Sequence, residues 1–143
     1  MNIKDFKYKD FPLQTYDKVR YSDTDRQGHV NNAMFSAFLE TGRVELLYNP
    51  DNPLHDQGGS FVIAEIKIDL LAEIVWPGII EIGTGITKVG NSSIKIAQGL
   101  YQNDTLVAVS ETVIVQIDIA TKKSKTLSET TKKVLSNHII CIE

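Results

Sequence analysis

The sequence has little of several features that define particular classes of protein. It contains a single cysteine, Cys141, so no disulfide can form within the chain. A lone thiol is typical of a reducing compartment, and we expect the protein to be cytoplasmic. Residues 1–11 mix lysine, aspartate and aromatic side chains and lack the apolar segment of a secretion signal, which agrees with this expectation.

Long runs of apolar residues and long runs of basic residues are also missing. The longest nearly apolar stretches, such as residues 113–119, are much shorter than the roughly 20 residues of a membrane-spanning helix, so no membrane span is expected. The net charge is −3, and the lysines at 122–125 and 132–133 are diluted by polar side chains and Glu129. Nucleic acid is therefore not an expected partner. No histidine, cysteine or carboxylate group has metal-ligand spacing, so neither a metal nor another cofactor is expected.

What is present is typical of a folded globular protein. Apolar residues make up 42% of the chain and charged residues 23%, which argues against disorder. The 143 residues are enough to bury a core, and no repeat, low-complexity block or linker divides them. We therefore predict a single domain over residues 1–143.

The first half of the chain predicts one strand and one long helix. Residues 15–21 are expected to form a strand, and residues 33–48 have apolar side chains at helical spacing. Asn31 or Asn32 is suited to cap the start of this helix. The polar, glycine-rich and asparagine-rich segment between the strand and the helix is expected to be a loop.

The second half predicts an antiparallel sheet. After a polar loop at residues 51–59, β-branched stretches alternate with turn signals such as Gly90-Asn91. Short turns require antiparallel neighbours, so the pattern predicts an α+β arrangement in which one helix faces the sheet. A short helix is expected near the C-terminus. The expected strands are 61–71, 79–89, 94–101 and 106–119, and the expected C-terminal helix is 126–135.

The segment that carries chemistry is residues 19–32. Asp23 and Asp25 precede His29 by 6 and 4 residues, which supplies a candidate base or nucleophile and a candidate orienting or proton-transfer group. Gly28 lets the backbone approach a ligand, and the N–H groups at a helix start favour negative charge. Ester or thioester hydrolysis needs these parts. Aspartate and asparagine are also ordinary turn and capping residues, so the local chemistry alone leaves a structural loop open.

This segment resembles the signature of a known family. The stretch RYSDTD at 20–25, followed by GHVNN at 28–32, is similar to the 4-hydroxybenzoyl-CoA thioesterase-like family of hotdog-fold proteins. The resemblance extends to Phe35, Glu40 and Arg43 on the expected helix, where the glutamate and the arginine are expected to pair. It covers a core of about residues 14–135.

The resemblance implies the fold and the assembly. The hotdog fold is a five-stranded antiparallel sheet wrapped around one long central helix. The edge strands over residues 61–71 would pair across a two-fold axis, because an apolar edge strand must be covered. A homodimer or homotetramer is therefore expected, with active sites at the subunit interface.

The resemblance also implies an activity, the hydrolysis of an acyl-CoA thioester. Asp25 would act as the nucleophile or as the general base on water. His29 would orient that carboxylate or help to bind and protonate the leaving thiolate. The backbone N–H groups of Gly28 and Val30 would polarise the thioester carbonyl. Gln27 stands where some members have asparagine, and its amide would hold the water.

The remaining candidates would bind the substrate. Asn31, Phe35 and Phe61 join Gln27 in this group, and their apolar members favour a fatty or aromatic acyl group. The chain length, the carrier and the pathway in lipid metabolism are open. Two alternatives are kept: an acyl-carrier-protein thioesterase, and a non-catalytic protein that binds acyl-CoA. The intact Asp25 and His29 speak against the non-catalytic one.

Overall fold

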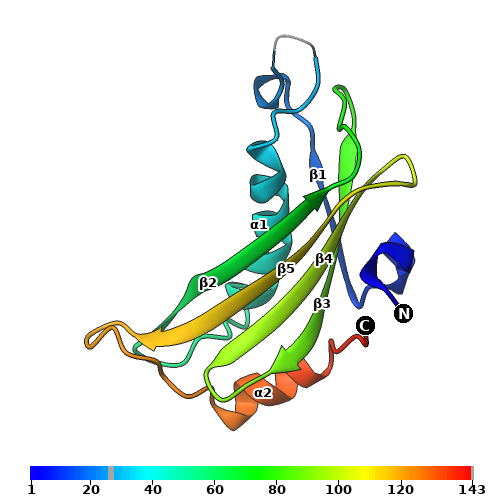
Figure 1. Ribbon diagram of the computed structural model, residues 1–143. Coiled ribbons are helices and arrows are strands. Elements are labelled where there is room, and N and C mark those ends of the chain that lie inside the picture. Colours follow the sequence, from blue (N-terminus) through cyan, green and yellow to red (C-terminus); the bar gives the residue numbers. More distant parts are fainter. Residues whose placement is uncertain (26–27, 143) are drawn as a thin grey trace.

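The computed structural model describes residues 1–25 and 28–142. Its sheet contains five antiparallel strands in the order β1-β3-β4-β5-β2, and the sheet curves around the long helix α1 (Figure 1). This arrangement confirms the expected α+β hotdog architecture. The elements are β1 (Leu13–Lys18), α1 (Met34–Leu47), β2 (Gly59–Leu70), β3 (Ile79–Val89), β4 (Ser93–Gln102), β5 (Thr105–Asp118) and α2 (Glu129–Ser136).

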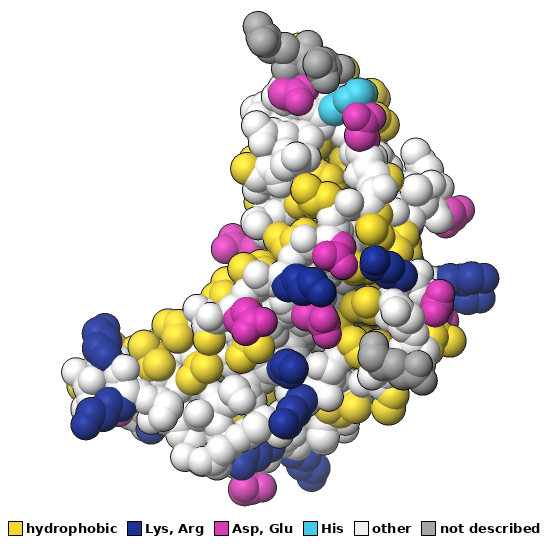
Figure 2. All heavy atoms as spheres, viewed as in Figure 1, with side chains coloured by type: hydrophobic (Ala, Val, Ile, Leu, Met, Phe, Trp, Pro, Cys, Tyr) yellow, Lys and Arg dark blue, Asp and Glu magenta, His cyan; other side chains and the backbone are white. Residues whose placement is uncertain are grey.

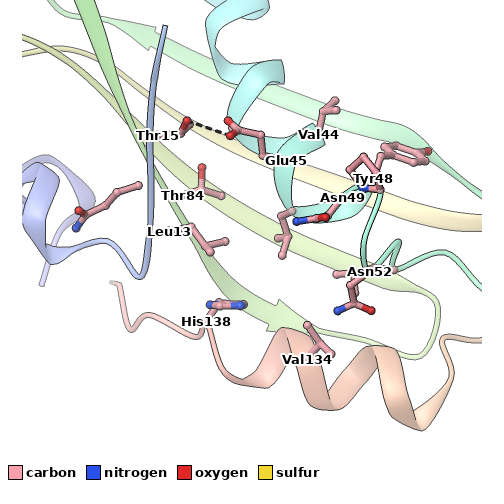
Figure 3. A pocket seen from close by; sticks show the side chains of 15 residues that line it. Leu13, Thr15, Val44, Glu45, Tyr48, Asn49, Asn52, Thr84, Val134 and His138 are labelled. Atoms are coloured by element: carbon pink, nitrogen blue, oxygen red, sulfur yellow. Dashed lines mark hydrogen bonds between the residues drawn. The ribbon is translucent and has the colours of Figure 1, made fainter.

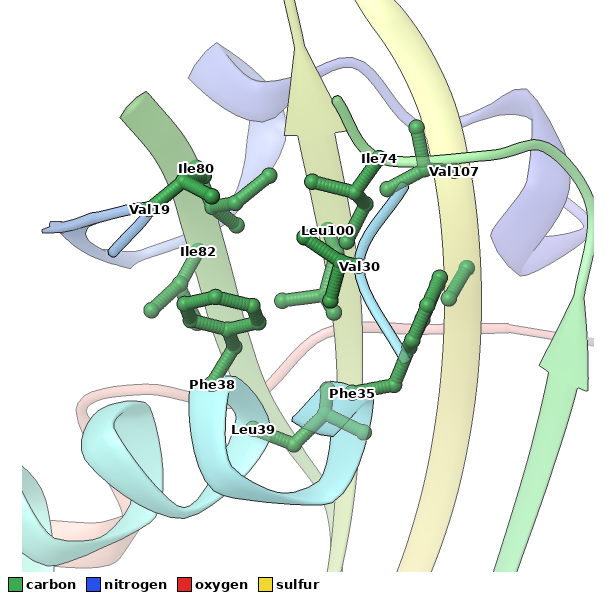
Figure 4. Packing of buried hydrophobic residues seen from close by; sticks show 11 residues of the cluster. Val19, Val30, Phe35, Phe38, Leu39, Ile74, Ile80, Ile82, Leu100 and Val107 are labelled. Atoms are coloured by element: carbon green, nitrogen blue, oxygen red, sulfur yellow. The ribbon is translucent and has the colours of Figure 1, made fainter. Parts of the chain in front are cut away.

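The core of the fold is the contact between α1 and the concave face of the sheet. Phe35, Phe38 and Leu39 on α1 are at most 2% exposed. They pack against apolar side chains of β3 and β4, and Figure 4 shows them facing Ile82 and Leu100. The spacing of apolar residues that predicted the helix is thus the spacing of its buried face.

The middle of α1 lies closest to the sheet at Gly42. A Cβ there would lie 2.7 Å from Gln98 Nε2 and 2.8 Å from Thr84 Oγ1, so the helix and the sheet pack closely at this glycine. Beside it, Arg43 is 5% exposed, and its Nη1 donates to Gln98 Oε1 at 3.4 Å. Burial lowers the pKa of this guanidinium. The expected ion pair with Glu40 is not formed between these two described residues, because Arg43 turns into the sheet while Glu40 stays exposed.

The strand boundaries follow the sequence with one clear difference. The first strand ends at Lys18 rather than at residue 21, because Tyr21–Asp23 forms a turn of 3-10 helix. The other strands begin and end within two residues of the expected bounds. The C-terminal helix begins later than expected, after Ser128, whose Oγ accepts the N–H of Thr131 at 3.1 Å and so caps the helix.

The convex face of the sheet is covered by the two ends of the chain. Ile3, Phe6 and Phe11 from the N-terminal segment pack on β4 and β5 together with Ile140 from the C-terminal end. Figure 1 shows both termini on this side of the sheet. No pattern in the sequence signalled this arrangement, because residues 1–11 alternate charged and apolar side chains without a regular period.

The β2 edge remains open. Val62, Ile63, Ile66 and Leu70 are 40%, 50%, 41% and 48% exposed. Figure 2 shows hydrophobic side chains gathered along this edge. An open edge strand carrying apolar side chains is a surface that folded proteins normally cover. None of the helices in the described part of the chain is long and apolar enough to cross a bilayer.

Candidate active site

A cavity of about 330 Å³ lies where α1 begins. One wall comes from the connection between β1 and α1 and from the first turn of the helix, and it includes Asp25, His29 and Phe35. The other wall is the end of β2 and the residues after it, 70–73. The cavity is therefore built by two connections that lie far apart in the sequence.

The β1–α1 connection is held in shape by its own backbone. The buried Asp23 carboxylate accepts the Arg20 N–H at 2.9 Å, and the Asp23 carbonyl accepts the Asn31 N–H at 2.9 Å. The Asp25 N–H donates to the His29 carbonyl at 2.9 Å, which closes the loop between these two residues. Asp23 thus orders the loop, which is a common role of aspartate in turns.

A glycine makes this closure possible. Gly28 has φ +76°, a left-handed conformation that side chains other than glycine rarely adopt. A Cβ at this position would meet nothing within 4 Å, so the requirement is one of backbone conformation rather than of space. The glycine predicted for close approach to a ligand therefore also serves the turn that carries Asp25 and His29.

The β2–β3 connection is fastened to this loop by a short antiparallel bridge. The Val30 N–H donates to the Ile74 carbonyl at 2.9 Å, and His29 pairs with Val75. The bridge places Glu73 beside the histidine, with His29 Nδ1 and Glu73 Oε1 at 3.2 Å. The His29 side chain is 37% exposed and that of Glu73 is 70% exposed, so both groups are open to solvent and to a ligand.

The structure brings together only part of the site that the sequence predicted. Asp25, His29, Val30 and Phe35 line the one cavity. Gln27 lies outside the described residues. The four residues that line the cavity are close enough to act on one ligand. They lie at the positive end of the α1 dipole.

Two of the expected roles do not fit the geometry. The Val30 N–H is already used by the Ile74 carbonyl, so the expectation that it polarises a substrate carbonyl is not met. Neither asparagine caps α1, whose N-cap residue is Ala33. Asn31 Oδ1 accepts the Ala33 N–H at 3.0 Å, because the chain makes one further turn before the helix begins, and Asn32 lines the cavity instead.

Phe61 is remote from this cavity within one chain. It lies near the start of β2, whereas the cavity wall is formed where β2 ends. Its ring packs edge-on against Tyr48 at a centroid distance of 5.8 Å, and its N–H donates to the Tyr48 hydroxyl at 3.1 Å. Phe61 therefore belongs to the opposite end of α1 in its own chain.

Sequence reasoning missed the whole second wall. Leu70 and Leu71 were expected only as the end of a strand, and no sequence pattern pointed to Glu73. A single carboxylate after a strand carries no signal of its own. Only the antiparallel bridge between His29 and Val75 shows that this carboxylate and the histidine meet.

A larger cavity, of about 630 Å³, lies at the other end of α1 (Figure 3). Leu13, Leu46, Leu54 and Val134 supply apolar parts of its wall. Thr15 Oγ1 donates a hydrogen bond of 3.1 Å to Glu45 Oε1 within this wall. In the described part of the chain, no three histidine, cysteine or carboxylate side chains are grouped so as to hold a metal ion, here or in the smaller cavity.

Comparison with known proteins gives a consistent result. The sequence model of the Thioesterase-like superfamily matches residues 19–135. The acyl-CoA thioester hydrolase YbgC of Escherichia coli is 28% identical over 114 residues, covering 77% of this chain and 85% of the relative. A thioesterase of Thermus thermophilus, solved in complex with coenzyme A and zinc, superposes with a TM-score of 0.76 at 25% identity, covering 87% of this chain and 98% of that one. The PA5185 protein of Pseudomonas aeruginosa has a TM-score of 0.84 at 19% identity over 96% and 98% of the two chains, which supports the fold.

Proposed function

Because the chain belongs to the thioesterase-like superfamily and is a thioester hydrolase, we propose that it hydrolyses acyl-CoA to a free acid and coenzyme A in the cavity at the start of α1. The observation that carries this proposal is the placement of Asp25 and His29 in one cavity at the positive end of a helix. Thioester hydrolysis needs a carboxylate next to the carbonyl carbon and a group that receives the leaving sulfur. These two side chains supply both.

Asp25 is the proposed centre of the reaction. Its carboxylate either attacks the thioester carbon or takes a proton from the water that attacks it. Both routes need the carboxylate to lie beside the carbonyl and both release the thiolate of coenzyme A. His29 is then the group next to the departing sulfur. Gln27, which stands one residue before Gly28, keeps its proposed role of holding the water.

The carbonyl oxygen needs a donor, and of the backbone N–H groups of Gly28 and Val30 that of Gly28 is the less firmly bonded within the chain. Its N–H makes only a long hydrogen bond, 3.3 Å, to the Asp25 carbonyl, whereas the Val30 N–H is held at 2.9 Å by Ile74. A substrate oxygen can compete for the longer bond. We therefore assign the polarising role to Gly28 and to the first turn of α1, and Val30 shapes the cavity wall.

The acyl group is proposed to lie on the apolar wall. Phe35, Leu70 and Leu71 line the cavity beside Asp25, and the two leucines are 48% and 41% exposed. Burial of an acyl chain against these side chains removes apolar surface from water on both sides. A fatty or aromatic acyl group fits such a wall better than a charged one.

A second copy of the chain is proposed to complete the site through the β2 edge. Antiparallel pairing of two β2 strands keeps their helix-facing residues on one side when Ile63 lies opposite Ile66 and Phe61 lies opposite Ile68. The same register places the start of one β2 beside the end of the other, at Leu70. Phe61 of the partner subunit would then approach the cavity that it cannot reach within its own chain.

The proposed function is tested by thiol release from a panel of short, medium, long and aromatic acyl-CoAs, with the wild type and Asp25→Asn run side by side. Release that requires Asp25 is expected, with the preferred acyl length showing which substrates fit the apolar wall. Matching acyl-carrier-protein substrates test the carrier. If the wild type releases no thiol from either carrier, the proposed function is wrong.

A further inference from the structure

The reaction proposed above assigns no role to the carboxylate of Glu73. It stands on the connection after β2 and lies 3.2 Å from Nδ1 of His29, on the wall of the same cavity. Of the ion pairs between described side chains, this one alone involves a residue proposed to act on the substrate. The contact therefore invites a functional explanation.

The fold does not depend on this contact. The Glu73 side chain is 70% exposed, and exposed ion pairs contribute little to stability. The two connections are fastened instead by the backbone hydrogen bond from Val30 to Ile74 and by the bridge between His29 and Val75. The Glu73 carboxylate is therefore not needed for the fold. Because it contacts a histidine in the cavity wall, we look for its role in that contact.

We propose that Glu73 is a positioning residue for His29. Its carboxylate accepts the Nδ1–H, which fixes the ring and its tautomer. Nε2, on the opposite side of the ring, is thereby reserved for the substrate. The proposal rests on the proposed thioesterase function and adds to it the residue that prepares the histidine.

The proton balance of the step follows from this arrangement. When the carbon–sulfur bond breaks, the sulfur keeps the electron pair and takes the proton from Nε2 of the imidazolium ring. The ring is left neutral with its remaining proton on Nδ1, still donated to Glu73. The water consumed in the hydrolysis restores the Nε2 proton. The Glu73 carboxylate accepts the Nδ1–H before and after the transfer, so its hydrogen bond keeps the ring in place throughout the step.

A double-mutant cycle tests whether Glu73 acts through His29. Turnover of the best acyl-CoA is measured for the wild type, Glu73→Ala, His29→Ala and the double variant. We expect Glu73→Ala to lower kcat about tenfold in the wild type and to have no further effect when His29 is already replaced. Glu73→Gln, which keeps an acceptor oxygen, should retain part of the activity. An equal loss in both backgrounds, or no loss at all, would overturn the proposal.

The matched control is Asp69→Ala. Asp69 lies on β2 four residues before Glu73, forms an exposed pair with Lys4 at 3.8 Å, and faces the convex side of the sheet. This change removes the same charge without touching the cavity, so turnover should stay at the wild-type level. A loss equal to that of Glu73→Ala would assign the effect to net charge and reject a positioning role.

A spectroscopic readout separates this proposal from the proposed function. The ¹⁵N shifts of the His29 ring, recorded without substrate at alkaline pH, report which nitrogen carries the proton. The Nδ1–H form is expected in the wild type and in Glu73→Gln, and the Nε2–H form should dominate in Glu73→Ala. If the protein releases no thiol from any substrate, the thioesterase function fails while the tautomer still decides whether Glu73 sets the ring. An unchanged tautomer in Glu73→Ala would reject the positioning role.

Discussion

The two ends of α1 carry two cavities of different kinds. The cavity at the start of the helix has about half the volume of the one at its end, roughly 330 against 630 Å³. The smaller one has Asp25, His29 and Glu73 in its wall, supplied by two connections joined through a backbone bridge. The wall of the larger one mixes apolar and polar side chains, among them His138 and Glu45, whose carboxylate accepts a hydrogen bond from Thr15.

This difference shows that size does not locate the chemistry of this molecule. A reaction needs groups that can exchange protons at the positive end of a helix dipole, and the smaller cavity has them there, with His29 Nδ1 3.2 Å from Glu73 Oε1 and Asp25 in the same wall. The larger cavity also has a carboxylate and a histidine in its wall, Glu45 and His138, but it lies at the other end of α1. The end of α1 has the opposite dipole and disfavours a developing oxyanion. Paired changes at the two ends of the helix test this difference, from the largest expected effect to the smallest.

The same chemical change at the two ends should differ by orders of magnitude in its effect on activity. Asp25→Asn is expected to lower kcat about a thousandfold or more, because the amide can neither attack the thioester nor accept a proton. Glu45→Gln, at the other cavity, should change kcat less than about twofold. Steady-state thiol release measures both. Thermal melting should show both variants folded, and a similar loss in the two would contradict the assignment of the site.

A substitution in the middle of α1, between the two cavities, should change the stability of the protein. Gly42→Ala places a methyl group within 2.8 Å of Gln98, Ile82 and Thr84, so the helix or these buried side chains must shift. We expect a loss of about 1–3 kcal/mol in the free energy of unfolding despite the better helix propensity of alanine. Urea denaturation measures it, with Ser36→Ala on the exposed face as the control. A stabilised Gly42→Ala protein would show that this contact is not tight.

The acidic residues near the two ends of α1 should also differ in role, because Asp25 is proposed to serve the reaction whereas Asp56 is expected to stabilise the fold. Near the end of α1, Asp56 Oδ2 accepts from Gln116 Nε2 at 2.9 Å and from the Ser128 N–H at 3.0 Å. Burial alone would raise the pKa of Asp56, but these hydrogen bonds outweigh it and the pKa is lowered. A lowered folded-state pKa means that the stabilisation is present above the unfolded value of 3.8 and is lost as the pH falls through the folded-state pKa.

Asp56→Asn is therefore expected to lower the free energy of unfolding by about 1–2 kcal/mol at neutral pH, because its NH₂ group would face two donors. The difference from the wild type should shrink below about pH 3.8, the unfolded value. Denaturant unfolding at several pH values measures this, and Asp51→Asn in the same loop is the control. Turnover should be unchanged. A difference that persists in acid would mean that the Asp56 charge is not the stabilising group.

The features predicted best from the sequence are those that repeat along the chain. The apolar spacing of Phe35, Phe38 and Leu39 predicted α1, and alternation with turn signals predicted the later strands, because each is a local consequence of one buried face. The loop with Asp25 and His29 was found because its residues are adjacent in the sequence. The strand end at Lys18 was missed because the Asp23 side chain closes a turn that periodicity cannot show.

What the sequence could not predict depends on contacts between distant segments. Glu73 meets His29 only because the β2–β3 connection pairs with the β1–α1 connection. Arg43 bonds with Gln98, 55 residues away, rather than with the neighbouring Glu40. Both contacts join segments that are distant in the sequence, so no rule about neighbouring residues could identify them.

The smallest expected effect comes from reducing the larger cavity. Val134→Phe adds an aromatic ring to its wall, at a half-buried position on α2. The fully buried Leu39 and Phe38 stand between this cavity and the start of α1, so no acyl chain should reach it, and kcat/KM should stay within about twofold for every acyl length. Ala72→Phe makes the same kind of addition to the smaller cavity and should lower kcat/KM most for the longest acyl-CoAs. If Val134→Phe, rather than Ala72→Phe, discriminates against long acyl chains, the larger cavity receives the acyl group, and the separation of the two ends of α1 is wrong.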